Sequence, residues 1–213
     1  MFCGKTDELL RRVELAQIAR KHVLLVKPTI DTRYKHDAVV SHSGREFPCY
    51  LLQPGKETRE NLVLAIDQGA VALISKMFGK IPLPEDGQLG RIILEQANIV
   101  AFDEGNFFDK ELFPQLCQEL KALSKDVIVA GLDLNFRAEP FGPMPELLAL
   151  ADEIMKLTAV CAVCGKPANR TQRMINGKPA PDGPEILVGG SETYEARCEK
   201  CFVHPSTVSQ GDA

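Results

Sequence analysis

Short apolar runs alternate with helical periods along the first part of the chain, and this alternation constrains the fold more than any other feature. Apolar runs typical of strands buried on both faces occur at residues 22–27 (HVLLVK), 70–75 (AVALIS), 98–103 (NIVAFD) and 126–130 (DVIVA). Apolar residues at helical spacing predict helices over residues 6–21, 57–67, 110–123 and 145–157. Strands that alternate with helices form a parallel sheet covered by helices. The sequence therefore predicts an α/β fold.

The length and net charge of the chain limit which classes of binding partner are expected. The chain has 213 residues, 45% of them hydrophobic, so it can bury a full core. Its net charge of −4 argues against a nucleic-acid partner and favours small-molecule ligands. No apolar run approaches the roughly 20 residues that cross a bilayer, and the N-terminus lacks the apolar segment of a signal peptide. We expect a cytoplasmic protein with no membrane partner.

Two Cys-x-x-Cys pairs, Cys161 with Cys164 and Cys198 with Cys201, are the strongest chemical signal. Such twin pairs in a reducing compartment are typical of structural zinc, because four thiolates close a tetrahedral site and leave no position for water. The alternatives are two unrelated thiol pairs or a redox Cys-x-x-Cys. Residues 165–197, between the pairs, outnumber the roughly 15–20 residues of an ordinary ribbon, so this loop can be laid across another part.

The amino-acid composition changes after residue 157, where Pro, Gly and polar residues become more frequent. We predict a first domain over residues 1–157 and a metal-held module over residues 158–202. The last residues, 203–213, carry few apolar side chains and are expected to form a flexible tail.

Gly4, Lys5 and Thr6 match the end of the phosphate-binding pattern GxxxxGK followed by Ser or Thr. In that pattern the Lys reaches the β- and γ-phosphates, and the hydroxyl binds Mg²⁺ at a helix N-terminus. The first Gly of the pattern would precede Met1. Three residues alone are weak evidence, and a chance match on the surface is the alternative.

An apolar strand that ends in acids supplies the partner motif. Asp103 and Glu104 follow the run at residues 98–103, where Asp103 can hold Mg²⁺ and Glu104 can accept a proton from an attacking hydroxyl. Asp31 and Arg33, after the first strand, are expected at the same edge of the sheet. The alternatives are a solvated turn for the two acids and a plain surface charge for Arg33.

Together these residues resemble one family. The segments MF-x-GKT, KPTIDTRY, SHSG, FDEGNFF, AGLDLNFRAEPFGPMPEL, CAVCGKPANRTQR and GGSETYEARCEKC are similar to the zinc-containing (type II) thymidine kinases. The resemblance spans almost the whole chain. It implies a P-loop, RecA-like parallel sheet flanked by helices, with a small zinc-ribbon module that carries a lasso loop. It further implies transfer of the γ-phosphoryl of ATP to the 5′-hydroxyl of thymidine or deoxyuridine, in nucleotide salvage, by a homotetramer.

The resemblance also implies roles for individual residues. Glu104 corresponds to the catalytic base. ATP and Mg²⁺ are assigned to Gly4, Lys5, Thr6, Asp31, Arg33 and Asp103. The nucleoside is assigned to backbone atoms of the lasso and to a wall of apolar side chains, for which the alternative is an ordinary aromatic core. These substrate-binding residues are Met1, Phe107, Leu132, Phe136, Phe141, Glu185, Ile186, Leu187, Val188, Gly189 and Tyr194.

Three departures from the family pattern stand out. Asn106 replaces the usual Gln. Residues 70–96 contain extra material, which we interpret as an added hairpin or loop. The strand and Gly that precede the phosphate loop are missing, so we expect the native product to extend upstream of Met1.

Two alternatives to an active kinase follow. One is a catalytically impaired kinase, truncated at its N-terminus. The other is a noncatalytic zinc-ribbon protein that binds nucleic acid or protein. Against the second, the basic residues of the loop are scattered rather than arranged in a stripe: Lys166, Arg170, Arg173 and Lys178.

Overall fold

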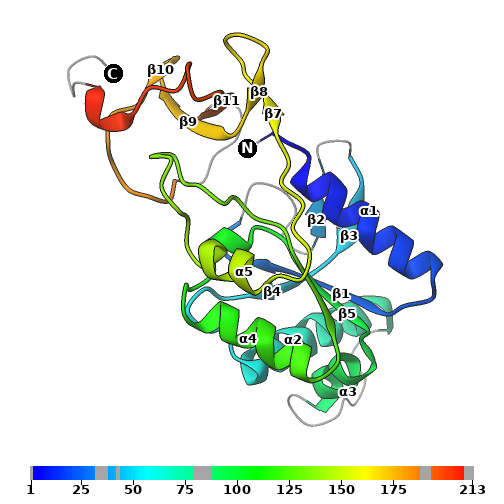
Figure 1. The fold of residues 1–213 in the computed structure, drawn as a ribbon. Coiled ribbons are helices and arrows are strands. Elements are labelled where there is room, and N and C mark those ends of the chain that lie inside the picture. The colour runs from blue at the N-terminus through cyan, green and yellow to red at the C-terminus, as the bar shows by residue number, and fades with distance from the viewer. Residues whose placement is uncertain (1, 32–37, 42–43, 79–87, 188–192, 209–213) are drawn as a thin grey trace.

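A four-stranded parallel sheet forms the centre of the protein (Figure 1). The computed structural model describes residues 2–31, 38–41, 44–78, 88–187 and 193–208, with the backbone alone over 72–78. The strand order is β4-β1-β5-β6, and every neighbouring pair is parallel. The strands are β1 (Val23–Pro28), β4 (Tyr50–Leu52), β5 (Ile99–Phe102) and β6 (Asp126–Val129). The predicted α/β fold is confirmed.

Helices cover both faces of this sheet. On one face, helix α1 (Lys5–Ile18) buries Leu9, Leu10 and Val13 against Leu25 of β1 and Ala101 of β5. The antiparallel hairpin of β2 (Ala38–Val40) and β3 (Glu46–Pro48) lies on the same side. Successive residues of a strand point to opposite faces of the sheet. The residues next to Leu25 and Ala101 therefore pack against the helices on the other face.

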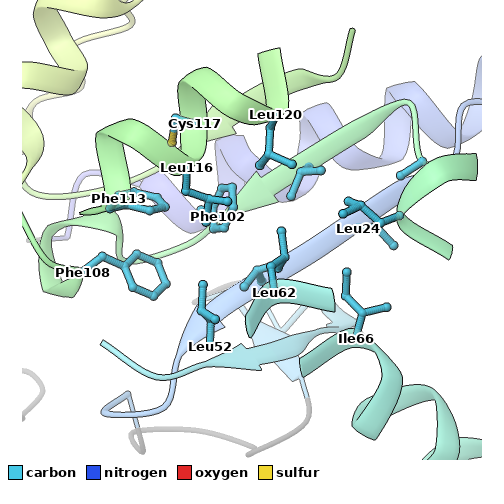
Figure 2. Packing of buried hydrophobic residues seen from close by; sticks show 14 of the residues in the cluster. Leu24, Leu52, Leu62, Ile66, Phe102, Phe108, Phe113, Leu116, Cys117 and Leu120 are labelled. Carbon is cyan, nitrogen blue, oxygen red and sulfur yellow. The ribbon is translucent and has the colours of Figure 1, made fainter. Parts of the chain in front are cut away.

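The opposite face carries the larger core (Figure 2). Leu24 and Phe102 point from the sheet toward apolar residues of the helices that cover it, among them Leu62 and Leu116. Phe102 meets Phe113 edge-on, with ring centroids 4.9 Å apart. These helices are α2 (Arg59–Phe78), α3 (Gln88–Gln96), α4 (Leu112–Ala122) and α5 (Met144–Leu150).

The predicted strand at residues 70–75 is wrong, because this run lies inside helix α2 (Arg59–Phe78). A short, continuous apolar run fits a buried helix as well as a buried strand, and periodicity alone does not separate the two. The outer strand beside β1 is β4 instead, whose three residues are too few to stand out in the sequence.

The extra material at residues 70–96 is helical wherever the structure describes it, rather than an added hairpin. It comprises the end of α2 and the whole of α3 (Gln88–Gln96), while residues 79–87 lie outside the described part. The two helices pack closely: Gly90 N donates to Asp67 Oδ1 over 3.0 Å. A methyl group at Gly90 would collide with the carbonyl oxygen of Val63.

The C-terminal module consists of two small antiparallel sheets. Strand β9 (Arg170–Ile175) is central in the larger one, between β10 (Lys178–Pro179) and β11 (Tyr194–Arg197). Strands β7 (Ala159–Val160) and β8 (Pro167–Ala168) form the other.

Two segments near this module differ from the sequence expectations. Helix α5 (Met144–Leu150) ends before the predicted limit of residue 157. Val203, the first residue of the expected flexible tail, is hydrogen-bonded to Gln172 of the module through both its backbone groups. Val203 N donates to Gln172 Oε1 over 2.8 Å, and the short 3-10 helix η2 (Pro205–Thr207) follows.

None of the described helices has the length and apolar character that a membrane span requires.

Candidate active site and metal centre

The N-terminus of α1 and the end of β5 meet at the carboxyl edge of the sheet. Gly4 adopts a left-handed conformation (φ 77°) that L side chains rarely tolerate, and the helix begins at Lys5. Thr6 Oγ1 lies 3.3 Å from Asp103 Oδ2, to which it donates. The structure therefore brings together two motifs that the sequence identified separately, at a helix N-terminus suited to phosphate.

Asp103 and Glu104 are both buried, with 4% and 6% of their surfaces exposed. Asp103 N donates to Val26 O over 2.9 Å, which continues the β1–β5 ladder to the end of the strand. Glu104 adopts the left-handed conformation (φ 50°, ψ 42°), which costs a non-glycine residue about 1–2 kcal/mol. Such strain, held at a strand end by the surrounding structure, is typical of functional sites.

The pKa of Asp103 is raised to about 7, first by burial and then by the Glu104 carboxylate, against the lowering effects of Lys5 and the Glu104 N–H. The Asp31 carboxylate also raises it. Asp31 is itself buried and lies three residues after the end of β1. Three carboxylates and one ammonium thus share a small volume. A divalent cation would stabilise the charged form of such a cluster, and its oxygen donors suit Mg²⁺.

The turn after Glu104 is braced on all sides. Gly105 N donates to Ala130 O over 2.8 Å, and a Cβ at Gly105 would stand 2.5 Å from the Val129 side chain. Asn106 Oδ1 accepts from Leu132 N over 2.9 Å. The side chain at the departure from the family pattern therefore fastens the turn to the segment that follows β6. The Nδ2 atom of Asn106 is buried without an acceptor among the described residues.

Sequence reasoning missed Glu57, which holds the other end of this turn. Glu57 is 2% exposed, and its Oε1 accepts from Asp109 N over 3.0 Å and from Gly55 N over 2.9 Å. A single Glu in a polar stretch gives no signal of burial, because its partners are backbone groups that any residue provides. Only the fold identifies it.

The predicted apolar wall is partly assembled. Phe107 and Phe141 meet edge-on with centroids 5.8 Å apart, and Leu132 lies beside Asn106 through its backbone. Phe136 is 3% exposed, and the guanidinium of Arg173 stacks 3.6 Å from its ring centroid. The Phe136 ring therefore forms part of the contact between the first domain and the C-terminal module.

The described part of the lasso lies against the loop between β6 and α5. Asn135 Nδ2 donates to Glu185 Oε1 over 2.9 Å, and Tyr194 Oη donates to Leu187 O over 2.7 Å. Ile186 and Leu187 remain 38% and 48% exposed. Four predicted site residues lie outside the described part: Met1, Arg33, Val188 and Gly189.

The four paired cysteines converge: the Sγ atoms of Cys161, Cys164, Cys198 and Cys201 all lie within 4.8 Å of one another. The Sγ atoms of Cys164 and Cys198 are 3.6 Å apart. Zn–S bonds of about 2.3 Å in a tetrahedron place sulfur atoms about 3.8 Å apart, so these residues fit zinc. Although burial raises the pKa of Cys161, N–H groups around its sulfur lower it to about 6, whereas hydrogen bonding with Cys198 and Cys164 raises the pKa of Cys201 to about 12. Cys161 therefore favours the thiolate that a metal needs, and Cys201 favours the thiol.

The start of the chain packs against this cysteine cluster. Phe2 and Cys3 pack against the apolar cluster formed by Cys161, Cys198 and neighbouring alanines. The residues predicted to bind phosphate begin directly afterwards, at Gly4. The cysteine cluster is therefore in direct contact with the segment that leads into α1.

Comparisons with known proteins agree with this arrangement. The family described as "Thymidine kinase" matches residues 1–77 and 80–202. A curated relative, the thymidine kinase of Coprothermobacter proteolyticus, is 48% identical over 199 residues, which cover 93% of this chain and 84% of the relative. These similarities favour a kinase over a noncatalytic zinc-ribbon protein.

Proposed function

The chain belongs to the thymidine kinase family, and from this premise we propose that it transfers the γ-phosphoryl of ATP to the 5′-hydroxyl of thymidine or deoxyuridine. The products are ADP and the nucleoside monophosphate. The contact between Thr6 and Asp103 carries this proposal, because it joins a phosphate-binding helix start to an acidic strand end. Phosphoryl transfer depends mainly on such positioning and charge stabilisation.

We assign the chemistry at the sheet edge as follows. Gly4 and Lys5 bind the phosphates at the start of α1, with Asp31 and Arg33 beside them. Thr6 and Asp103 would hold Mg²⁺, which neutralises phosphate charge when bound. Glu104 accepts the proton of the nucleoside 5′-hydroxyl as the oxygen attacks the γ-phosphorus. Its burial supports this role, because a base shielded from water does not promote hydrolysis of ATP.

The nucleoside is proposed to bind between the apolar wall and the lasso. Phe107, Leu132 and Phe141 contact its rings, together with Met1 and Phe136. The backbone of residues 185–189 meets the edge of the base, with Tyr194 behind it. The hydrogen bond from Tyr194 to Leu187 O supports this arrangement, since it orients the lasso backbone.

The module over residues 158–202 is proposed to be a lasso domain with one structural zinc, attached to a kinase domain over residues 1–157. Four cysteines complete the coordination of zinc and leave no position for substrate, so the ion would stabilise the module rather than take part in the reaction. We further propose that the enzyme is cytoplasmic and homotetrameric.

Incubation with ATP, Mg²⁺ and thymidine tests the function. We expect thymidine monophosphate and ADP in equal amounts. With deoxyuridine in place of thymidine, we expect deoxyuridine monophosphate and ADP. Absence of both products would overturn the proposal for this chain. Repeating the assay on a version extended upstream of Met1 separates an impaired, truncated kinase from a protein without the activity.

A further inference from the structure

Arg173 is a buried arginine at the centre of the contact between the lasso and the kinase body. It lies on β9 and is 3% exposed. Its Nη1 donates to Pro184 O over 2.6 Å, and its Nη2 donates to Glu185 O over 2.9 Å and to Tyr194 Oη over 3.1 Å. The face of the same guanidinium stacks on the Phe136 ring at 3.6 Å. One side chain therefore contacts the lasso, β11 and the loop after β6.

The shape of the guanidinium matters in this position. Two Nη atoms donate to the carbonyls of successive residues, Pro184 and Glu185, while the flat face covers an aromatic ring. A lysine ammonium has neither the planar fork nor the stacking face. Burying a guanidinium group is costly unless its N–H donors find acceptors. The carbonyls of Pro184 and Glu185 and the hydroxyl of Tyr194 supply these acceptors, so moving the lasso away would leave a buried charge without them. Its Nε finds no acceptor among the described residues.

Residues next to Arg173 and Phe136 also bind the lasso. Tyr194 Oη, which accepts from Arg173, donates onward to Leu187 O. Arg137, next to Phe136, donates to Asp182 Oδ1 over 2.7 Å and to Gly183 O over 2.5 Å. Arg137 and Arg173 thus bind consecutive lasso positions, residues 182–185, and both guanidinium groups lie over the Phe136 ring. The carbonyl of Leu187 is fixed indirectly, through the Tyr194 phenol.

We propose that Arg173 is a positioning residue that preorganises the lasso backbone for the nucleoside. By holding residues 184–187 against Phe136, it removes motion that the nucleoside would otherwise have to arrest on binding. It acts through the lasso and does not itself touch the reacting atoms. This inference rests on the proposed function, since residues 185–189 are taken there to contact the base.

Arg173→Lys is the decisive variant, because it keeps the charge and removes the fork and the stacking surface. We expect the KM for thymidine to rise at least about tenfold, which corresponds to roughly 1.4 kcal/mol. The KM for ATP, kcat and the zinc content should stay within about twofold. Arg170→Lys, on the same strand but paired across the ladder with Arg197, is the matched control and should change none of these values.

Amide hydrogen exchange without substrate provides a second readout. Exchange at residues 185–187 should be faster in Arg173→Lys than in the wild type, while β1 and β5 stay protected. A variant with unchanged thymidine KM, or one that loses zinc and ATP affinity together, would overturn the positioning role. If the wild type fails to phosphorylate thymidine, the proposed function fails, but the exchange result still decides whether Arg173 holds the lasso.

Discussion

Thr6 Oγ1 and Asp103 Oδ2 stand 3.3 Å apart although 97 positions separate them in the chain. This contact joins the first turn of α1 to the end of β5. A hydroxyl at a helix N-terminus and a carboxylate at a strand end are the pair that holds Mg²⁺ in phosphoryl-transfer sites of this kind.

Replacing Glu104 with Gln should lower kcat by about 10²–10⁴-fold, the usual effect of losing a general base. The amide keeps nearly the same shape and cannot accept the proton. ATP affinity, measured by equilibrium binding, should stay within about twofold. Glu119→Gln, at an exposed position of α4, is the control with unchanged kcat. A Glu104→Gln enzyme with wild-type turnover would remove this residue as the base.

The raised pKa of Asp103 should make the stability of the folded protein depend on pH. Its pKa is raised from 3.8 to about 7, so the folded protein holds this proton more tightly than the unfolded chain. That contribution is fully present below the unfolded pKa and is lost as pH rises through about 7. Without divalent cations, Asp103→Asn should therefore gain Tm relative to the wild type as the pH rises from about 4 to about 7, the limits set by the two pKa values.

The same comparison with Mg²⁺ provides the control. At pH 8 or so, above the raised pKa, Mg²⁺ should raise the Tm of the wild type, because ligand binding stabilises the folded state, and it should have little effect on Asp103→Asn. A Tm difference between the two proteins that is independent of pH would contradict the raised pKa.

Gly90→Ala should destabilise the protein, although Ala favours helices over Gly by about 1 kcal/mol. The new methyl group would collide with the Val63 carbonyl, where α3 crosses α2. We expect a loss of about 1–3 kcal/mol in the free energy of unfolding, as for other overpacked sites, measured by urea denaturation. Glu95→Ala, on an exposed position of α3, should be close to neutral. A stabilised Gly90→Ala would show that the two helices can separate without cost.

Cys198→Ser should abolish zinc binding, because it removes one of four converging thiolates. The purified wild type should release one zinc per chain when its thiols are titrated, and the variant almost none. Since Phe2 and Cys3 pack against this cluster, the KM for ATP should also rise in the variant. Cys49→Ser, outside the cluster, should retain its zinc; a zinc-free wild type would disprove the metal site.

The fold was predictable where one kind of local signal dominated. β1, β5 and β6 were recognised because each is a short apolar run, and the twin Cys-x-x-Cys pairs identified the four cysteines that converge in the structure, because the spacing is local to each pair. The run at residues 70–75 was misassigned because an apolar run inside a buried helix has the same composition as a strand. Strand β4 (Tyr50–Leu52) was missed because a run of three residues is too short to show a strand pattern.

The sequence by itself determined the candidate acids, the candidate phosphate-binding start of α1 and the four paired cysteines, because each depends on residue type and short spacing. Only the tertiary structure decided which buried polar groups serve them. Glu57, Asn106 and Arg173 mainly engage backbone groups distant in sequence, which carry no identity that a pattern could reveal. Burial turns those ordinary contacts into requirements, because a polar group removed from water must find its partner within the fold.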